Sequence, residues 1–529
     1  MIESTALNLA TPGVYTQELN AFPNSVVAVP TAVPAFVGYT ARADYKGKSL
    51  LGKPRKISSM ADFLTFFGVM QPASAGAPPT PAPPNGQYDP VYYLSPSAGL
   101  GDLTIGGKPY DLVPDAGTIF YLYNSIRLFY ANGGGDAYVV SVGSYGRPVG
   151  KPIPAGADLV NPNVKLADLQ QALTALADED EPTMLVMPDA NLLKPTENAT
   201  LMQDMIAFAG ATKRSLVAVL DVQDGLDPDP LTWQDSITSF RTNVGINFLN
   251  YAAAYFPFLR TTITQSQDLN FTNAGGAAAL AKILPEYNLP GSAARTILDG
   301  IIKPPPNAPS AAQSNAALLQ ASDSYAQIAQ AVLDRVNTLP PSGAMAGVIS
   351  MVDNNAGVWT APANVSLVSV TDTTFKVTDA KQANLNVDAA TGKSINVIRM
   401  FIGQGVLVWG ARTLDGNSQD WRYLNVRRTM IMIEQSIKAA ARAYVFAPND
   451  ANTWSTVSSA ITNFLTGLWQ QGALAGPTPA TAFNVAVGLG TTMTAQDILD
   501  GRMNINVGVA ITHPAEFIVI SYIQQMQKA

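Results

Sequence analysis

The sequence predicts an α/β protein whose main sheet is mostly parallel and is flanked by helices. Between residues 118 and 258, helical patterns alternate with short, nearly continuous apolar segments, which are typical of strands buried on both faces. At 529 residues the chain is too long for one ordinary core, so we expect about two to four domains or a core with large insertions. Both observations favour a parallel sheet with helices on both faces, to which further domains or insertions are added.

The elements of this core follow one another in order. A first strand is expected at AFVGYTA (35–41), whereas the prolines of VVAVPTAVP (26–34) exclude that segment from a central sheet position. A helix from about residue 119 carries its apolar residues on one face and ends at the glycines 133–135. Further strands are expected at 137–142, 183–188, 215–222 and 245–258, with helices at 166–176, 197–213 and 233–242 between them.

Differences in amino-acid composition predict how the rest of the chain is organised into insertions and domains. Residues 43–116 are loop-rich and proline-rich, so we expect an exposed outer insertion. Residues 261–338 are rich in Ala, Ser and Asn and predict a second, helical insertion. The α/β core then comprises residues 26–42, 117–260 and 339–420, which leaves 1–25 as an N-terminal arm and 421–529 as an α+β C-terminal domain.

Composition also excludes several kinds of chemistry. A net charge of −7 argues against a nucleic-acid binder, and the lack of cysteine excludes thiolate nucleophiles and cysteine-based zinc sites. The only histidine, His513, lies beside Pro514 at a strand boundary, which leaves no His-based metal cluster. The acidic run 178–181 is most simply a solvated loop, with a weak cation site as the alternative. We therefore expect no catalytic residue, no metal and no cofactor.

Targeting and membrane signals are weak as well. The first residues lack the basic and apolar regions of a secretory signal, and no run approaches the roughly 18 apolar residues of a membrane-spanning helix. We expect a protein that is soluble when made and does not insert stably into a membrane.

The C-terminal region begins with a basic helix over 421–446. Counted from residue 427, four cations (Arg427, Arg428, Lys438 and Arg442) against one acid (Glu434) give +3 in a chain of −7. This face is either an ordinary solvated surface or a docking surface for an acidic partner. A second helix, over 452–476, carries no charged residue, which predicts that its polar face is packed against something.

The chain closes on strand-like segments whose edges need protection. FNVAV (483–487) and MNINVGVAI (503–511) predict half-buried strands, and the segment after residue 516 is apolar on both faces. Such a strand either closes the sheet of its own chain or adds to the sheet of a neighbouring copy. The N-terminal candidate comprises Val14, Tyr15, Thr16, Gln17, Glu18 and Leu19, and the C-terminal candidate comprises Phe517, Ile518, Val519, Ile520, Ser521, Tyr522 and Ile523.

Several segments together resemble the tail sheath family of contractile phages and related bacterial injection machines. They occur in the family order: TPGVYTQEL (11–19), AFVGYT (35–40), FYANGGGDAYVVSV (129–142), YAAAYFPFL (251–259), LPPSGAMAGVISMVDNNAGVWTAPAN (339–364), INVIRMFIGQGVLVWGARTL (395–414), YLNVRRTMIMIEQSI (423–437) and FLTGLWQQGALAG (464–476). The insertions 43–116 and 261–338 are unlike the short members of this family.

The resemblance implies a mechanical protein with a subtilisin-like core and no protease activity. Sheath subunits stack as sixfold rings around an inner tube, linked by terminal arms that add strands to neighbouring C-terminal domains. Contraction, triggered from a baseplate, drives the tube through a membrane. The resemblance assigns the arm role to residues 14–19 and 517–523, and the tube-facing role to Arg427, Lys438 and Arg442.

It also implies partners and a place of assembly. These are further copies of the chain, an inner tube protein, and baseplate and terminator or cap proteins, assembled in the bacterial cytoplasm into a phage virion or phage tail-like particle. Another assembly protein, such as a tube or baseplate component, and a degenerate α/β enzyme are the alternatives.

Overall fold

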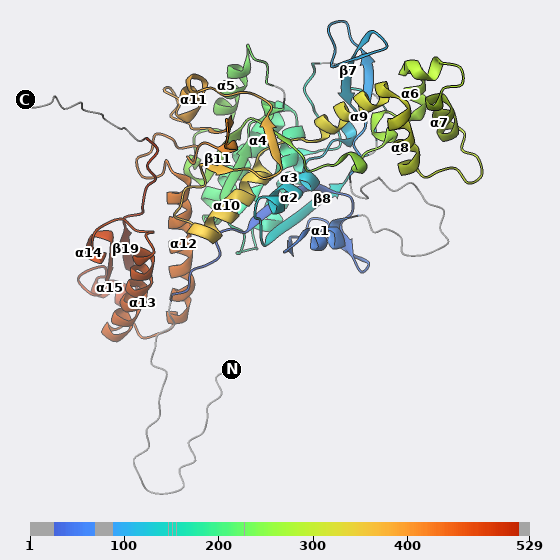
Figure 1. Cartoon of the computed structure of the whole chain (residues 1–529). Coiled ribbons are helices and arrows are strands. Elements are labelled where there is room, and N and C mark those ends of the chain that lie inside the picture. The colour runs from blue at the N-terminus through green and yellow to red at the C-terminus, as the bar shows by residue number, and fades with distance from the viewer. Residues whose placement is uncertain are drawn as a thin grey trace, which may run out of the picture. The chain divides into compact units, whose positions relative to one another are not determined.

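The computed structural model describes residues 26–68, 88–146, 148–150, 152–154, 156–226 and 228–517 (Figure 1). Its contacts divide the chain into two compact units. Among the described residues, the core unit contains Val29–Ile433 and residues 511–517, and the C-terminal unit contains Glu434–Ala510 and residues 26–28. The division falls inside one helix, so the domain boundary that we predicted at residue 421 lies within the core unit.

The core unit is built on a nine-stranded sheet in the order β14-β17-β16-β11-β10-β9-β1-β8-β4. Neighbouring strands from β8 to β16 all pair in parallel, and only the strands at the two edges pair antiparallel. The mostly parallel α/β fold is therefore confirmed. The strands are β1 Pro34–Thr40, β4 Arg55–Ile57, β8 Ala137–Ser144, β9 Met184–Val186, β10 Val217–Asp221, β11 Ala252–Phe256, β14 Val365–Ser366, β16 Asn396–Phe401 and β17 Gly405–Val408.

The apolar runs become central strands because both faces of the sheet are covered. Every residue of β1, β9, β10 and β11 is buried. Helices α2 (Leu122–Ala131) and α10 (Ser342–Ala356) pack on each other and against β1, β9 and β10. A separate layer, which contacts β1, β8 and β10, consists of α3 Leu166–Leu176, α4 Pro195–Ala207 and α5 Trp233–Asn243.

Glycines allow two close approaches around α2. Gly133, with φ of 90°, turns the chain as the helix ends, as the triple glycine predicted. Gly347 of α10 faces the same helix, where an added Cβ would lie 2.5 Å from the carbonyl oxygen of Phe129. The absence of a side chain at Gly347 therefore sets how closely α10 and α2 pack.

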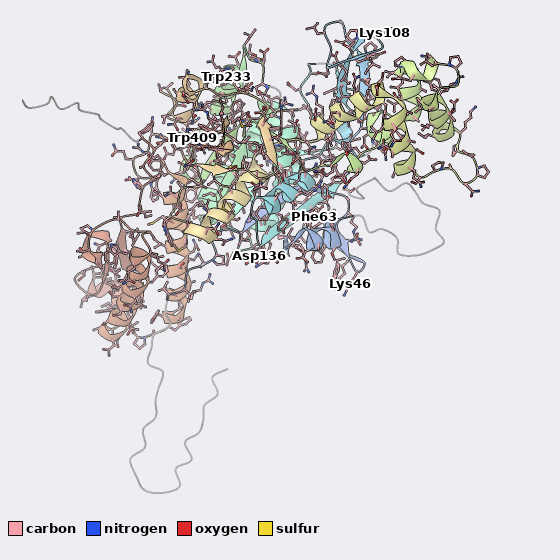
Figure 2. All side chains as sticks on the ribbon, in the orientation of Figure 1. Lys46, Phe63, Lys108, Asp136, Trp233 and Trp409 are labelled. Atoms are coloured by element: carbon pink, nitrogen blue, oxygen red, sulfur yellow. The ribbon has the colours of Figure 1, made fainter. Side chains whose placement is uncertain are left out.

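The first insertion is more ordered than its composition predicted. Strand β4 joins the main sheet beside β8, where Glu181 accepts hydrogen bonds from Lys56 and from the Tyr138 hydroxyl. Phe63 of α1 packs against Phe67 and against Tyr123 of α2 (Figure 2). A second, antiparallel sheet has the order β5-β7-β6. The bounds are β2 Asp44–Tyr45, β3 Lys48–Ser49, α1 Met60–Phe67, β5 Tyr92–Pro96, β6 Leu103–Ile105 and β7 Lys108–Pro114.

The second insertion is helical, and it contacts the first. Its Asn273 side chain donates to the carboxylate of Asp89 and to the carbonyl of Pro90, both at 2.8 Å. The small sheet of the first insertion and these helices therefore pack together within the core unit (Figure 1). The helices are α6 Ala277–Ile283, α7 Ala293–Ile302, α8 Ala311–Ala321 and α9 Asp323–Val336. The remaining core elements are β12 Leu259–Thr261, β13 Thr338–Leu339, β15 Val370–Thr373 and α11 Asp379–Asn386.

The C-terminal unit combines long helices with a β-hairpin. Its elements are the second half of α12 Leu424–Ala441, α13 Ala451–Gln470, α14 Pro479–Ala482, β18 Phe483–Val487, α15 Ala495–Leu499 and β19 Ile505–Val509. The Asp450 carboxylate caps α13 by accepting from the Thr453 backbone N–H at 2.9 Å. Within the described residues, no helix combines the length and apolar character that a membrane span requires.

Candidate assembly site in the C-terminal region

The hairpin of β18 and β19 is the clearest candidate for a contact with another chain. The two strands pair antiparallel, with Val485 opposite Val507. In the described part of the chain, neither strand has a second neighbour, so each offers an outer edge of backbone N–H and C=O groups. A two-stranded sheet is marginal by itself, and its open edges accept a further strand readily.

One face of the hairpin is supported from within the unit. Phe483, Val485, Val487, Ile505, Val507 and Val509 alternate with exposed or polar residues and are all half-buried. Helix α13 packs against β18 through an apolar stripe that contains the buried Val457, Ile461 and Leu465. The hairpin is thus held flat on a helix while its edges stay open, which is the geometry for strand addition.

Helix α13 also presents an uncharged polar surface. The side chains of Asn452, Ser455, Ser459 and Asn463 are exposed along one face, where an isolated surface helix would carry Lys and Glu. The expectation that this face packs against a partner stays a prediction.

The cations of α12 fall into two groups that the sequence pattern did not separate. Arg427 is only 4% exposed, with its guanidinium 4.4 Å from the centre of the Trp421 ring and 4.6 Å from that of Tyr251. Such a side chain is not at the surface of this chain, so Arg427 does not fit the tube-facing role. Lys438, in the half of α12 that belongs to the C-terminal unit, and Arg442, which directly follows the helix, are both exposed.

Arg428 ties the first half of α12 to the core. It donates to both carboxylate oxygens of Asp353 in α10, at 2.6 and 2.8 Å, and to the Thr31 carbonyl at 2.7 Å. Both side chains of the pair are at most 3% exposed. A fully buried bidentate ion pair of this kind orients the helix at the point where the chain passes into the C-terminal unit.

A second ion pair holds the start of the C-terminal arm. The buried Arg412 donates to Glu516 through Nε at 3.0 Å, and Tyr423 and Asn386 donate to the same carboxylate, both at 3.2 Å. Burial is the largest single influence on the pKa of Glu516 and raises it, but the hydrogen bonds and charge of Arg412 together with the hydrogen bonds from Asn386 and Tyr423 hold that pKa below its ordinary value. The chain is thus anchored one residue before the proposed arm strand.

The arms themselves are almost entirely outside the described residues. Phe517 is 75% exposed, while Val14–Leu19 and residues 518–523 fall outside the described ranges. The strand assignments of both arms therefore stay predictions.

Two buried carboxylates were not singled out from the sequence. Asp189, after β9, accepts from the backbone N–H groups of Tyr39, Tyr121 and Leu122. Asp221, at the end of β10, accepts from the Ser342 backbone N–H and hydroxyl, each at 2.7 Å. Burial raises the pKa of each to about 6, against the opposing effect of these hydrogen bonds. In the sequence, the signal that could have identified both residues is an acid at the end of an apolar strand segment.

These pKa values predict a pH dependence of stability. Between pH 4 and pH 6 the folded chain binds more protons at Asp221 than the unfolded chain, whose carboxyl has a pKa of 3.8, so ionisation costs stability as pH rises through this window. The cost is on the order of 3 kcal/mol by pH 7. Asp221→Asn should therefore gain about that much free energy of unfolding relative to the parent between pH 4 and pH 7, measured by urea denaturation. Asp420→Asn, at an exposed site, should show no such trend; equal slopes for Asp221→Asn and the parent would contradict the assignment.

In the described ranges, no group of three or more His, Asp or Glu side chains is arranged to hold a metal ion. His513 lies beside the Tyr423 ring, with the ring centres 5.8 Å apart. The site is a set of edges and surfaces suited to protein contacts.

Several known proteins are similar to this chain in sequence. Residues 417–524 match the phage tail sheath C-terminal domain. The tail sheath protein of Vibrio phage KVP40 is 28% identical over 141 residues, which cover 27% of this chain and 21% of that protein. The tail sheath protein of Burkholderia phage BcepMu is 29% identical over 142 residues, covering 26% and 29%. The chain thus aligns with less than a third of the length of these relatives.

Solved structures extend the likeness to nearly the whole chain. The helical sheath of the anti-feeding prophage in its contracted state is 28% identical, covers 98% of this chain and 99% of its own, and has a TM-score of 0.57. The contracted PVC sheath complex, an extracellular contractile injection system, is 26% identical with 98% of both chains covered and a TM-score of 0.54. In sequence and in fold this chain thus resembles the sheath proteins of contractile tails.

Proposed function

We propose that this chain is the subunit of a contractile sheath, which polymerises as stacked sixfold rings around an inner tube. The observation that carries this proposal is the likeness, over 98% of the chain, to sheath subunits of two contractile injection systems. The open-edged hairpin supports it, because a helical polymer needs a repeated contact that each copy both offers and receives.

Strand exchange links the subunits in this proposal. Residues 14–19 and 517–523 of neighbouring copies add to the outer edges of β18 and β19. The anchoring of Glu516 by Arg412 supports this role, since it holds the base of the C-terminal arm on the core and leaves the next residue exposed. A fixed base reduces the entropy lost when the arm docks.

Contraction of the polymer drives the tube through a target membrane. The partners are an inner tube protein, baseplate proteins and a terminator or cap protein, assembled in the bacterial cytoplasm into a phage or phage tail-like particle. The role is mechanical, with no catalysis and no nucleic-acid contact.

Electron microscopy of the purified full-length chain tests the proposal. Negative-stain images at increasing concentration should show hollow cylinders or stacked rings with sixfold symmetry in end views. A monodisperse monomer at high concentration, without and with the tube protein, would contradict it.

The tube-facing role is proposed for Lys438 of α12 and for Arg442, which directly follows that helix; both are exposed. The double variant Lys438→Glu and Arg442→Glu should weaken co-assembly with the tube protein by about tenfold or more, because reversing charges at an interface replaces attraction by repulsion. Co-sedimentation at low and high salt measures the loss. The matched variant Lys282→Glu and Lys303→Glu changes exposed lysines of the second insertion by the same charge and should co-assemble normally. Equal behaviour of the two variants would remove the tube-facing assignment.

A further inference from the structure

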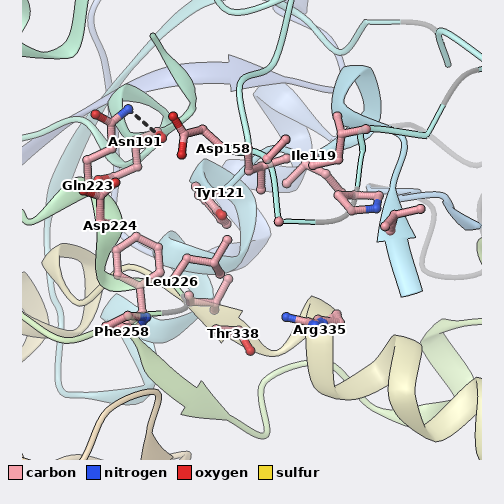
Figure 3. Close-up of a pocket in the computed structure, with 18 of the residues that line it drawn as sticks. Ile119, Tyr121, Asp158, Asn191, Gln223, Asp224, Leu226, Phe258, Arg335 and Thr338 are labelled. Atoms are coloured by element: carbon pink, nitrogen blue, oxygen red, sulfur yellow. Dashed lines mark hydrogen bonds between the residues drawn. The ribbon is translucent and has the colours of Figure 1, made fainter. Parts of the chain in front are cut away.

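An open cavity lies at the carboxyl ends of the central parallel strands, and the sheath function does not use it. Its volume is about 690 Å³, within the range of roughly 300–1,000 Å³ typical of small-molecule sites. Asn191, Gln223 and Phe258, which follow β9, β10 and β11 respectively, line it (Figure 3). This edge of an open parallel sheet is where ligands bind in α/β proteins.

The cavity is built from three parts of the core unit. Tyr121 and Phe258 come from the α/β core, Leu112 from β7 of the first insertion, and Thr338 from the strand that ends the second insertion. A ligand bound there contacts all three parts, so its binding stabilises their packing.

Tyr121 supplies a polar group without a partner. Its side chain is 5% exposed and its ring packs edge-on against Phe258, with the centres 6.1 Å apart. Its hydroxyl makes no hydrogen bond to any described residue, and the side chain lies among those that line the cavity (Figure 3). The hydroxyl is not one of the enclosed polar atoms that lack a partner, so it is open to the cavity and free to bond a polar group of a ligand there.

The charge of the cavity is strongly negative. Asp111, Asp158, Asp224 and Asp229 line it, and Asp158 and Asp224 form no ion pair or side-chain hydrogen bond with a described residue. The fifth carboxylate, Asp102, pairs with Arg335 at 3.2 Å. Carboxylates gathered around a concave site raise the local concentration of cations and repel anions.

We propose that this cavity binds a small organic cation, an alkylammonium or guanidinium compound with an apolar portion. Its charge meets Asp158, Asp224 and Asp229 at the opening, and its apolar part contacts the rings of Tyr121 and Phe258, where a cation also gains from the aromatic faces. The Tyr121 hydroxyl accepts a hydrogen bond from the ammonium or guanidinium group. None of the residues that line the cavity belongs to the hairpin or to the proposed arms. The test of this proposal is therefore independent of the test of the sheath function.

Calorimetric titration of the full-length chain tests the proposal with three probes: phenethylamine, agmatine and the uncharged 2-phenylethanol. Both cations should bind at one site per chain with a Kd below about 1 mM, and 2-phenylethanol at least about tenfold more weakly. Tyr121→Phe, which keeps the ring, should weaken cation binding by several-fold, and Asp224→Asn with Asp229→Asn by about tenfold. Asp420→Asn removes an exposed charge that does not line the cavity and should leave binding unchanged.

Three results would overturn the proposal. They are the absence of saturable binding of either cation, equal binding of 2-phenylethanol, and an equal loss in the Asp420→Asn control. Thermal unfolding with each probe gives a second readout, since a cation that bridges the insertions and the core should raise the melting temperature of the parent and not of the Asp224→Asn, Asp229→Asn variant.

Discussion

Deletion of residues 518–529 should abolish polymerisation while leaving the subunit folded. The deleted segment contains six of the seven residues of the proposed arm strand and follows the Glu516 anchor. A strand of six residues adds about six backbone hydrogen bonds to a hairpin edge, at roughly 1 kcal/mol net each. Losing about 6 kcal/mol at every link weakens subunit association by about four orders of magnitude. Sedimentation velocity and electron microscopy measure the loss, and circular dichroism checks the fold.

A shorter deletion is the matched control. Removing only residues 524–529 leaves the proposed strand intact and should preserve the polymer. Deletion of residues 1–20 should act like the longer C-terminal deletion, because we propose that the N-terminal arm also adds to the hairpin of a neighbour. Polymer formation by the 518–529 variant at the parent's concentration would contradict strand exchange by this arm.

Replacing Asp353 by alanine should destabilise the core unit by about 3–5 kcal/mol, the cost of leaving a buried charge without its partner. The pair of Asp353 with Arg428 is bidentate and at most 3% exposed, and Asp353 also accepts from the Thr31 hydroxyl at 2.6 Å. Among the described residues, loss of the carboxylate leaves the buried guanidinium with the Thr31 carbonyl as its hydrogen-bond acceptor. Chemical denaturation followed by tryptophan fluorescence measures the change.

An exposed ion pair of the same length is the control for Asp353. Arg399 and Asp379 approach to 2.6 Å, but the Asp379 side chain is 95% exposed. Asp379→Ala should therefore cost less than about 1 kcal/mol. The double variant Asp353→Leu with Arg428→Met should recover much of the stability that Asp353→Ala loses, because it removes both charges. Equal losses in Asp353→Ala and Asp379→Ala would show that burial does not decide the strength of the pair.

Local pattern predicted the central sheet well and the first insertion poorly. Strands such as β10 and β11 are short apolar runs, and every residue in them is buried, so composition alone reveals them. Strand β4 is only three residues long and pairs with β8, some eighty residues later in the chain. A segment that owes its structure to a distant partner carries little local signal, and the prolines around it favoured a loop.

The candidate site, too, was predicted well in one part and poorly in another. The alternation of residues 483–487 and 505–509 predicts two strands, and these pair as a hairpin. The charge count of α12 treated Arg427, Arg428, Lys438 and Arg442 as one basic face, although only Lys438 and Arg442 are exposed. Arg427 is buried by Trp421 and Tyr251, and Arg428 by Asp353 from α10. Nothing in the local sequence distinguishes the two buried cations, Arg427 and Arg428, from the two exposed ones.

By itself the sequence determined the fold class, the strands of the central sheet, the two strands near residues 485 and 507, and the absence of cysteine and of histidine clusters. These follow from residue type and from periodicities of two and 3.6 residues, which depend on near neighbours in the chain. Only the tertiary structure decided which charges are buried, that Asp189 and Asp221 ionise with difficulty, that the two insertions pack together and that a cavity opens between them and the core. Each of these depends on desolvation by residues far away in the sequence, and desolvation is a property of the packed chain.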